Sequence, residues 1–266
     1  KNNTIDVCFH AAAYKHVDLV QSNFLYSLKN NVLGTLNTIR LSIKFNIKNY
    51  VLISTDKAVR PTNYMGASKR FSELILIYYS KYINESIDTN LSAVRFGNVI
   101  GSSGSVIPLF NKQINAGGPV TVTDKNVKRY FMTINEAAEL VIQSSSISES
   151  GDIFVLDMGE QVLINEIAKK MINLKGLKLV TNKKFDNEIE IIYTGLRPGE
   201  KLNEELYIDG NFSKTVHPKI YKANENNKLV DNKFGKIIQD MELGLKNNNY
   251  DKVNKILINC IENFKI

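Results

Sequence analysis

Three adjacent side chains, Thr55, Asp56 and Lys57, offer a hydroxyl, a carboxyl and an amine directly after an apolar run. That run, residues 50–53, has the continuous apolar character of a central parallel strand covered on both faces. In open α/β sheets, ligands bind beyond the carboxyl ends of the strands. These groups could therefore supply a proton donor, a proton acceptor and a hydrogen-bonding anchor. From spacing alone, an ordinary polar loop with a surface ion pair is an equally good interpretation.

Two further segments follow expected strands in the same way. One begins at His10, after a short buried strand expected over residues 5–9, and the other begins at Gly97, after a strand expected over residues 91–96. Parallel strands end at one edge of a sheet, so we expect both segments beside the Thr55–Lys57 turn. This edge is the predicted ligand site.

The apolar periodicity predicts helices between these strands, over residues 17–45 and 65–82. The resulting order of strand, helix, strand, helix and strand predicts an α/β fold with a doubly wound parallel sheet. Further strands are expected over residues 119–124, 153–157 and 188–193. Further helices are expected over residues 134–144, 164–174 and 234–266. The segment 222–233 is expected to begin as a loop.

A change in texture near Gly104 predicts two regions. The first region would comprise residues 1–104 and the second residues 105–266. The strand over residues 153–157 is expected to return to the first sheet.

The composition excludes several classes of protein. With 43% hydrophobic and 23% charged residues among 266, the chain is neither disordered nor fibrous. The net charge of +7 suits nucleic acid, a membrane surface or an anionic metabolite, but the lysines are spread out without interleaved aromatics, so no nucleic-acid partner is expected. Two cysteines and three histidines show no metal-ligand spacing, so no metal is expected.

The helix over residues 65–82 introduces a family resemblance. In short-chain dehydrogenases a tyrosine precedes a helical lysine by four residues, so that both point at the cofactor. Here Met65 stands at that position before Lys69, and Tyr64 lies about 100° around the helix. Seven segments carry a more specific pattern: HAAAYKHV (10–17), STDKAV (54–59), PTN (61–63), MGASKR (65–70), RFGNV (95–99), RYFMT (129–133) and LRPGEKL (196–202). Together they resemble the polysaccharide-biosynthesis branch of extended short-chain dehydrogenases, whose members are similar to UDP-N-acetylglucosamine 4,6-dehydratases.

The resemblance implies that residues 1–104 form a partial Rossmann domain that binds NAD. It implies that residues 105–266 form an α/β region that binds the nucleotide-sugar substrate. The first βαβ units of the Rossmann domain, with the glycine-rich phosphate turn, would precede Lys1, so the chain is expected to be the C-terminal part of a longer enzyme. Any membrane anchor is expected in that preceding region only, and the protein is expected in the cytoplasm or on the cytoplasmic face of the membrane. The residues implied to contact the cofactor are His10, Ala11, Ala12, Asn31, Ser54, Lys69 and Phe96.

The implied reaction is the 4,6-dehydration of a UDP-N-acetylhexosamine to a 4-keto-6-deoxy sugar nucleotide. Asp56 matches the acid that protonates the departing C6 hydroxyl, and Lys57 matches the base that removes the C5 proton, which requires a neutral amine. Thr55 would hydrogen-bond the sugar O4. Because Met65 cannot accept the proton of the C4 hydroxyl, Asp56, a water molecule or Tyr64 could take that role. Met65, at the position of the family tyrosine, and Lys69 complete the implied catalytic set.

Other residues match family positions around the substrate. Asn98, Arg129, Arg197 and Glu200 match positions that grip the nucleotide, and Lys15 and His16 are expected to shape the mouth of the substrate site. Arginine forks suit a diphosphate, although each could also form a surface ion pair.

Several alternatives stay open. A C5-inverting dehydratase or a nucleotide-sugar epimerase would have the same fold, although a simple 4-epimerase needs no elimination pair such as Asp56 and Lys57. An inactive fragment that binds a UDP-sugar is a third possibility. The spacing of Gly97, Gly101 and Gly104 also resembles a dinucleotide-binding fingerprint. Pro108 argues against that interpretation, because it would interrupt the helix that binds the phosphates.

A homo-oligomer is also expected. The amphipathic helices over residues 19–45 and 68–82 are candidate interfaces, and core packing explains their apolar faces equally well.

Overall fold

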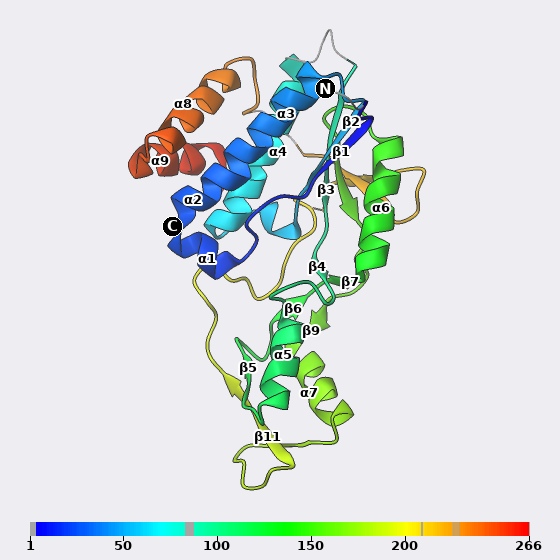
Figure 1. Cartoon of the computed structure of the whole chain (residues 1–266), viewed down its shortest axis with the longest axis vertical. Coiled ribbons are helices and arrows are strands. Elements are labelled where there is room, and N and C mark those ends of the chain that lie inside the picture. Colours follow the sequence, from blue (N-terminus) through cyan, green and yellow to red (C-terminus); the bar gives the residue numbers. More distant parts are fainter. Residues whose placement is uncertain (1–3, 83–87, 209, 226, 228, 266) are drawn as a thin grey trace. The chain divides into compact units, whose positions relative to one another are not determined.

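The computed structural model describes residues 4–82, 88–208, 210–225, 227 and 229–265. The chain forms two compact units (Figure 1). The first contains the residues up to Phe96, Glu139–Asp157 and the chain from Glu205 onward, and the second contains Gly97–Ala138 and Met158–Glu204. The chain leaves the first unit after Phe96 and returns to it twice, whereas the sequence placed one boundary near Gly104 with a return of the strand over residues 153–157.

A six-stranded sheet forms the centre of the first unit, in the order β1-β2-β3-β8-β13-β12. The strands are β1 (Val7–His10), β2 (Asn49–Ile53), β3 (Asn90–Arg95), β8 (Ile153–Leu156), β13 (Ile220–Ala223) and β12 (Phe212–Lys214). The first four are parallel, and β13 runs antiparallel to both β8 and β12. In Figure 1, α3 (Gly34–Lys44) and the part of α6 (Ile134–Ile147) from Glu139 onward lie on opposite sides of this sheet. The predicted α/β fold is confirmed.

The first strand is less buried than the sequence predicts. β1 lies at the edge of the described sheet, where Val7 and Phe9 are 36% and 41% exposed. Cys8 and His10 alternate with them and face the core. A short apolar run does not distinguish an edge strand with one buried face from a central strand.

A π-helical turn divides the helix expected over residues 17–45. The segment consists of α1 (Val17–Ser22), α2 (Phe24–Leu28), the π turn (Lys29–Leu33) and α3. Asn31 is buried in the π turn, and its carbonyl accepts hydrogen bonds from Thr35 Oγ1 at 2.6 Å and Ser72 Oγ at 3.3 Å. Such turns often occur at functional sites. The apolar spacing continues across the turn and therefore does not reveal it.

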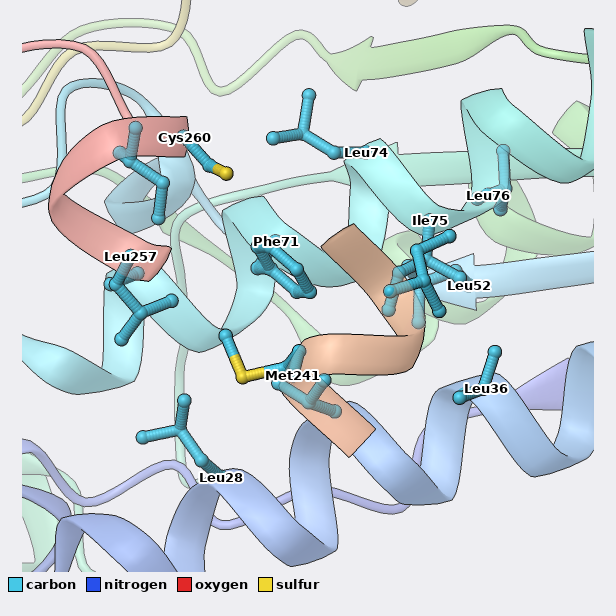
Figure 2. Close-up of a cluster of buried hydrophobic side chains, with 14 of the residues drawn as sticks. Leu28, Leu36, Leu52, Phe71, Leu74, Ile75, Leu76, Met241, Leu257 and Cys260 are labelled. Carbon is cyan, nitrogen blue, oxygen red and sulfur yellow. The ribbon is translucent and has the colours of Figure 1, made fainter. Parts of the chain in front are cut away.

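Helix α4 (Tyr64–Tyr82) is buried along most of its length. The C-terminal helices α8 (Phe234–Lys246) and α9 (Tyr250–Cys260) cover it, and Met241 and Leu257 belong to the same core cluster as Phe71 (Figure 2). The face of α4 that was a candidate subunit interface is thus occupied by the same chain, and the homo-oligomer stays a prediction. No helix among the described residues has the length and apolar character needed to span a membrane.

The second unit has its own small parallel sheet and core. Its elements are β4 (Asn98–Val99), α5 (Val106–Asn115), β5 (Val120–Val122), β6 (Lys128–Arg129), β7 (Phe131–Met132), β9 (Val162–Leu163), α7 (Ile164–Leu174), β10 (Lys178–Val180) and β11 (Glu188–Tyr193). The sheet order is β10-β11-β5, and side chains such as Phe110 and Ile172 fill the space beneath α5 and α7.

Strands β12 and β13 were not predicted. The loop expected from residue 222 onward begins inside β13, because Lys222 and Ala223 belong to that strand. Both strands are very short and carry lysines, so they lack the apolar alternation that indicates a strand.

We expect Leu257→Ala to lower the free energy of unfolding by about 2–5 kcal/mol, because it leaves a cavity between α9 and the core. The adjacent Ile258 is 43% exposed, so Ile258→Ala is a matched control that should cost less than about 1 kcal/mol. Urea unfolding measures both values. Equal losses for the two variants would show that α9 does not form part of the core.

Candidate active site

The Thr55–Lys57 turn is built from the end of β2. Thr55 is extended and precedes a short 3-10 turn over Asp56–Ala58, and its hydroxyl accepts a long hydrogen bond of 3.4 Å from the amide of Lys57. The amide of Asp56 donates to the carbonyl of Phe96, just beyond β3, at 3.2 Å. The turn is therefore attached to the neighbouring strand end, as expected for groups at one sheet edge.

The Asp56 carboxylate is the most unusual group in this turn. It is fully buried, and its Oδ1 accepts hydrogen bonds from Thr55 Oγ1 at 2.8 Å and Lys57 Nζ at 3.0 Å. Its Oδ2 has no hydrogen-bond partner among the described residues. A buried carboxylate oxygen without a partner is costly and rare, and such exceptions are found at reactive groups.

Gly66 allows the turn to rest directly on α4. The amide of Gly66 donates to the side chain of Asn63, which caps the helix, at 2.9 Å. A Cβ atom on Gly66 would lie 2.2 Å from the carbonyl oxygen of Lys57 and 2.9 Å from Cβ of Pro61. Only glycine permits this approach. The role of Gly66 was not predicted, although the residue lies inside the MGASKR segment.

Lys69 reaches the same strand end from α4. Its Nζ donates to the carbonyl of Ile53 at 2.7 Å, and the side chain is almost fully buried. Burial lowers the pKa of Lys69 to about 8, against the opposing effect of Glu73. The structure thus brings Lys69 to the strand that carries the Thr55–Lys57 turn.

Tyr64 points to another part of the protein. Its ring stacks on Phe24 at 4.3 Å between centroids, and its hydroxyl lies 3.2 Å from both Tyr250 Oη and Asn254 Oδ1 in α9. Burial raises the pKa of Tyr64 well above its usual value. Met65 is buried in the core cluster. The Tyr64 hydroxyl is therefore engaged by residues of α9.

Asn31 holds the segment after β1. Its Oδ1 accepts from the amide of Tyr14 at 2.7 Å, and its Nδ2 donates to the carbonyl of Tyr14 and to Ser68 Oγ, both at 3.0 Å. These bonds attach the segment to α4. Of the other residues expected there, Ala11, Ala12, Lys15 and His16 are exposed.

His10 lies at the end of β1 beside α3. Its Nε2 is 3.2 Å from Thr35 Oγ1, and burial lowers its pKa to about 4, with a further contribution from the charge of Lys69. The ring is therefore neutral at pH 7, which fits a structural or cofactor-side residue.

Arg129 and Glu200 stabilise the second unit. Arg129 donates to Glu200 Oε1 at 2.9 Å and to the carbonyls of Lys128 and Leu202 at 2.7 and 3.2 Å. Glu200 Oε2 accepts from the amide of Arg197 at 3.2 Å, so Glu200 organises the RPGE turn. This geometry fits Arg129 as a support of that turn more closely than as a diphosphate ligand. Of the other two residues expected to bind the substrate, Arg197 is exposed and Asn98 is half-buried.

The parallel sheet and the polar groups at its strand ends define a Rossmann-type domain of the short-chain dehydrogenase class. The family described as polysaccharide biosynthesis protein matches residues 1–225, and the chain belongs to this family.

Named relatives cover much of this chain. The capsular polysaccharide biosynthesis protein CapD of Staphylococcus aureus is 44% identical over 235 residues, which are 88% of this chain and 37% of CapD. The probable polysaccharide biosynthesis protein EpsC of Bacillus subtilis is 47% identical over 216 residues, 81% of this chain and 34% of EpsC. The chain thus spans little more than a third of the length of these relatives. UDP-glucose 4-epimerase of Rickettsia massiliae is 35% identical over 202 residues, 76% of this chain and 56% of that protein.

Solved structures show the same fold. Pen from Bacillus thuringiensis superposes with a TM-score of 0.74 at 36% identity, covering 82% of this chain and 65% of Pen. DesIV, a dTDP-glucose 4,6-dehydratase from Streptomyces venezuelae solved with NAD, gives a TM-score of 0.65 at 20% identity, covering 76% of this chain and 64% of DesIV. The likeness to DesIV is one of fold alone.

We expect Gly66→Ala to destabilise the protein by about 1–3 kcal/mol, because the new methyl group overlaps the Lys57 carbonyl. Gly34→Ala is the matched control: Gly34 also lies in a helix, and a Cβ there meets nothing within 4 Å. The control should be neutral or stabilising by up to about 1 kcal/mol. Urea unfolding compares the variants, and a harmless Gly66→Ala would contradict the close approach.

The wild-type protein should lose stability relative to His10→Asn as the pH falls from 7 to 4.5. The imidazole has a pKa of 6.5 in the unfolded chain and about 4 in the folded protein, so over this range the unfolded chain binds the proton first. The resulting loss in the free energy of unfolding, relative to His10→Asn, is at most about 3 kcal/mol. Urea unfolding of both chains at several pH values measures it, and a gap that stays constant with pH would refute the shift.

Proposed function

We propose that this chain carries the catalytic residues of an NAD-dependent dehydratase that converts a UDP-N-acetylhexosamine into a 4-keto-6-deoxy sugar nucleotide. The observation that carries the proposal is the buried Asp56 carboxylate, whose Oδ1 is held by Thr55 and Lys57 and whose Oδ2 has no partner among the described residues. Removing water across two adjacent carbons requires a proton donor and a proton acceptor together, and Asp56 and Lys57 supply that pair.

The residues at the strand ends fit NAD. Ala11 and Ala12 present small side chains after β1, and the Lys69 ammonium retains N–H donors beyond the one that binds the Ile53 carbonyl. Such donors suit ribose hydroxyls. NAD, when bound, supplies a reversible two-electron acceptor beside the sugar.

Asp56 is the best supported acceptor of the C4 hydroxyl proton. Tyr64 is committed to α9, and the thioether of Met65 is no base. In this scheme Asp56 takes the O4 proton as C4 is oxidised and gives it to the C6 hydroxyl, which leaves as water when the C6–O bond breaks. Neutral Lys57 takes the C5 proton in that elimination and returns it to C5 as C6 is reduced. The two side chains then end in the protonation states in which they began.

The second unit supplies the proposed nucleotide ligands. We assign the diphosphate to the exposed guanidinium of Arg197, with Asn98 as a further ligand, and keep Arg129 and Glu200 as supports of the RPGE turn. Lys15 and His16 precede α1 and are exposed. This exposure is compatible with the proposed position of both residues at the mouth of the substrate site.

A nucleotide-sugar epimerase is the second candidate. The identity of 35% with the Rickettsia massiliae UDP-glucose 4-epimerase favours it. The two functions differ in product, because an epimerase keeps the C6 hydroxyl and a 4,6-dehydratase turns C6 into a methyl group.

The decisive experiment incubates the full-length protein with UDP-N-acetylglucosamine and NAD and analyses the product by NMR. A new C6 methyl signal and a C4 ketone support dehydration, whereas a change in configuration at C4 with C6 retained supports the epimerase. Binding of UDP without NAD and without turnover would support an inactive binding protein.

In the same assay, Asp56→Asn should abolish the 4-keto product, because an amide neither accepts the O4 proton nor protonates the leaving hydroxyl. Loss of general acid–base catalysis typically lowers a rate by about 10²–10⁴-fold. Asp240→Asn is the matched control, since Asp240 pairs with Lys252 at 2.8 Å on the surface of α8. Undiminished product from Asp56→Asn would overturn the assignment.

A further inference from the structure

Four charged side chains form a group that contacts Ser54, the residue before the Thr55–Lys57 turn. Arg95 and Glu73 are fully buried, and the side chains of Arg70 and Glu225 are 12% and 3% exposed. Arg95 donates to both oxygens of Glu73, from Nε and Nη2, at 2.7 Å each. Arg95 also donates to both oxygens of Glu225, at 3.2 Å for the Nη2 bond. Arg70 pairs with Glu73 at 3.0 Å and with Glu225 at 2.7 Å. The two arginines and two glutamates form a closed and neutral group, which we call the charge cluster.

The charge cluster holds the ends of two strands. Ser54, the residue before the turn, donates from Oγ to Glu73 Oε1 at 2.6 Å. Arg95 is the last residue of β3, and the next residue, Phe96, accepts the amide of Asp56. The contacts of the Ser54 hydroxyl and of the Asp56 amide therefore both lead back to the cluster within one residue.

Glu225 is the member of the cluster that comes from far along the chain. It follows β13 by two residues, while Arg70, Glu73 and Arg95 lie in α4 and β3. Arg95 and Glu73 are fully buried, so the cluster is stable only while every charge has its partner. Burial alone would raise the pKa of Glu73, but Arg95 and Arg70 lower it to about 2, so this carboxylate stays ionised. Without the Glu225 charge, the two arginines would face a single carboxylate.

We propose that Glu225 is a positioning residue: through Arg95 and Glu73 it fixes Ser54 and thereby the place of Asp56 and Lys57. The role in catalysis rests on the proposed function, whereas the role in holding the turn does not. The strand pair β12–β13 thus supports the Thr55–Lys57 turn through Glu225, which lies two residues after β13.

Amide hydrogen exchange of the full chain tests the structural part. Glu225→Gln should raise exchange of the Asp56 amide by about tenfold, the equivalent of 1.4 kcal/mol of lost protection. Helix α3 should be unaffected. The control is Glu242→Gln, which removes the ion pair of 3.0 Å between Glu242 in α8 and Arg40 in α3 and should leave the turn unchanged. Unchanged exchange at Asp56 in Glu225→Gln overturns the proposal.

Ser54→Ala covers the case in which Glu225→Gln does not fold. It removes only the bond from Ser54 to Glu73 and leaves the four charges balanced. The same rise in exchange at Asp56 is expected, and its absence overturns the proposal.

Kinetics of Glu225→Gln test the catalytic part. We expect kcat to fall about tenfold while KM for UDP-N-acetylglucosamine changes less than twofold, because Glu225 acts through Arg95 and Arg70 of the charge cluster and is not among the proposed nucleotide ligands. Raised exchange with unchanged kcat overturns the positioning role. A wild-type protein that makes no 4-keto product refutes the proposed function instead, and the exchange result still decides whether Glu225 holds the turn.

Discussion

The contact between the Lys57 carbonyl and the first turn of α4 is the constraint on which the site depends. Gly66 provides the space for it, and Asn63 fixes the helix start that places Gly66 there. Lys69, one helical turn later, binds the carbonyl of Ile53. The helix therefore holds the chain on both sides of Ser54, at the end of β2 and in the turn. This arrangement keeps an acid and an amine together where the strand ends.

The site contains two kinds of buried charged group. Some have partners for all their strong hydrogen-bonding atoms, and one does not. Glu73 and Arg95 are buried with every strong partner in place, and they give the turn a rigid support. Asp56 is equally buried but keeps one oxygen without a partner among the described residues. Structural charges gain from complete pairing, whereas a group that exchanges protons with a substrate must keep a lone pair available.

Sequence patterns predicted the parts of the structure that depend on local periodicity. The strand over residues 50–53, the helix from Met65 and the turn between them follow from apolar spacing and polar punctuation. The π turn at Asn31 and the exposed face of β1 did not follow, because neither changes the spacing of apolar residues. The short strands β12 and β13 were not predicted, because their lysines interrupt the alternation of apolar and polar residues that indicates a strand.

Within the site, the side chains of the turn were predictable and their supports were not. Thr55, Asp56 and Lys57 stand together in the sequence, so their proximity needs no tertiary information. The partnership of Glu225 with Arg95 spans 130 positions and depends on how β13 pairs with β8. An arginine at the end of a buried strand was the one available signal, since a buried guanidinium requires carboxylates nearby.

The C-terminal helices make the folding unit larger than the family match. The family match ends at residue 225, whereas α8 and α9 supply Phe234, Met241 and Leu257 to the core around α4. A recombinant chain cut at the family limit would leave the side of α4 that carries Phe71 open to water. Such a product would expose a wide apolar surface and tend to aggregate. Expression boundaries should therefore follow the core, with at least the residues through Phe264 retained.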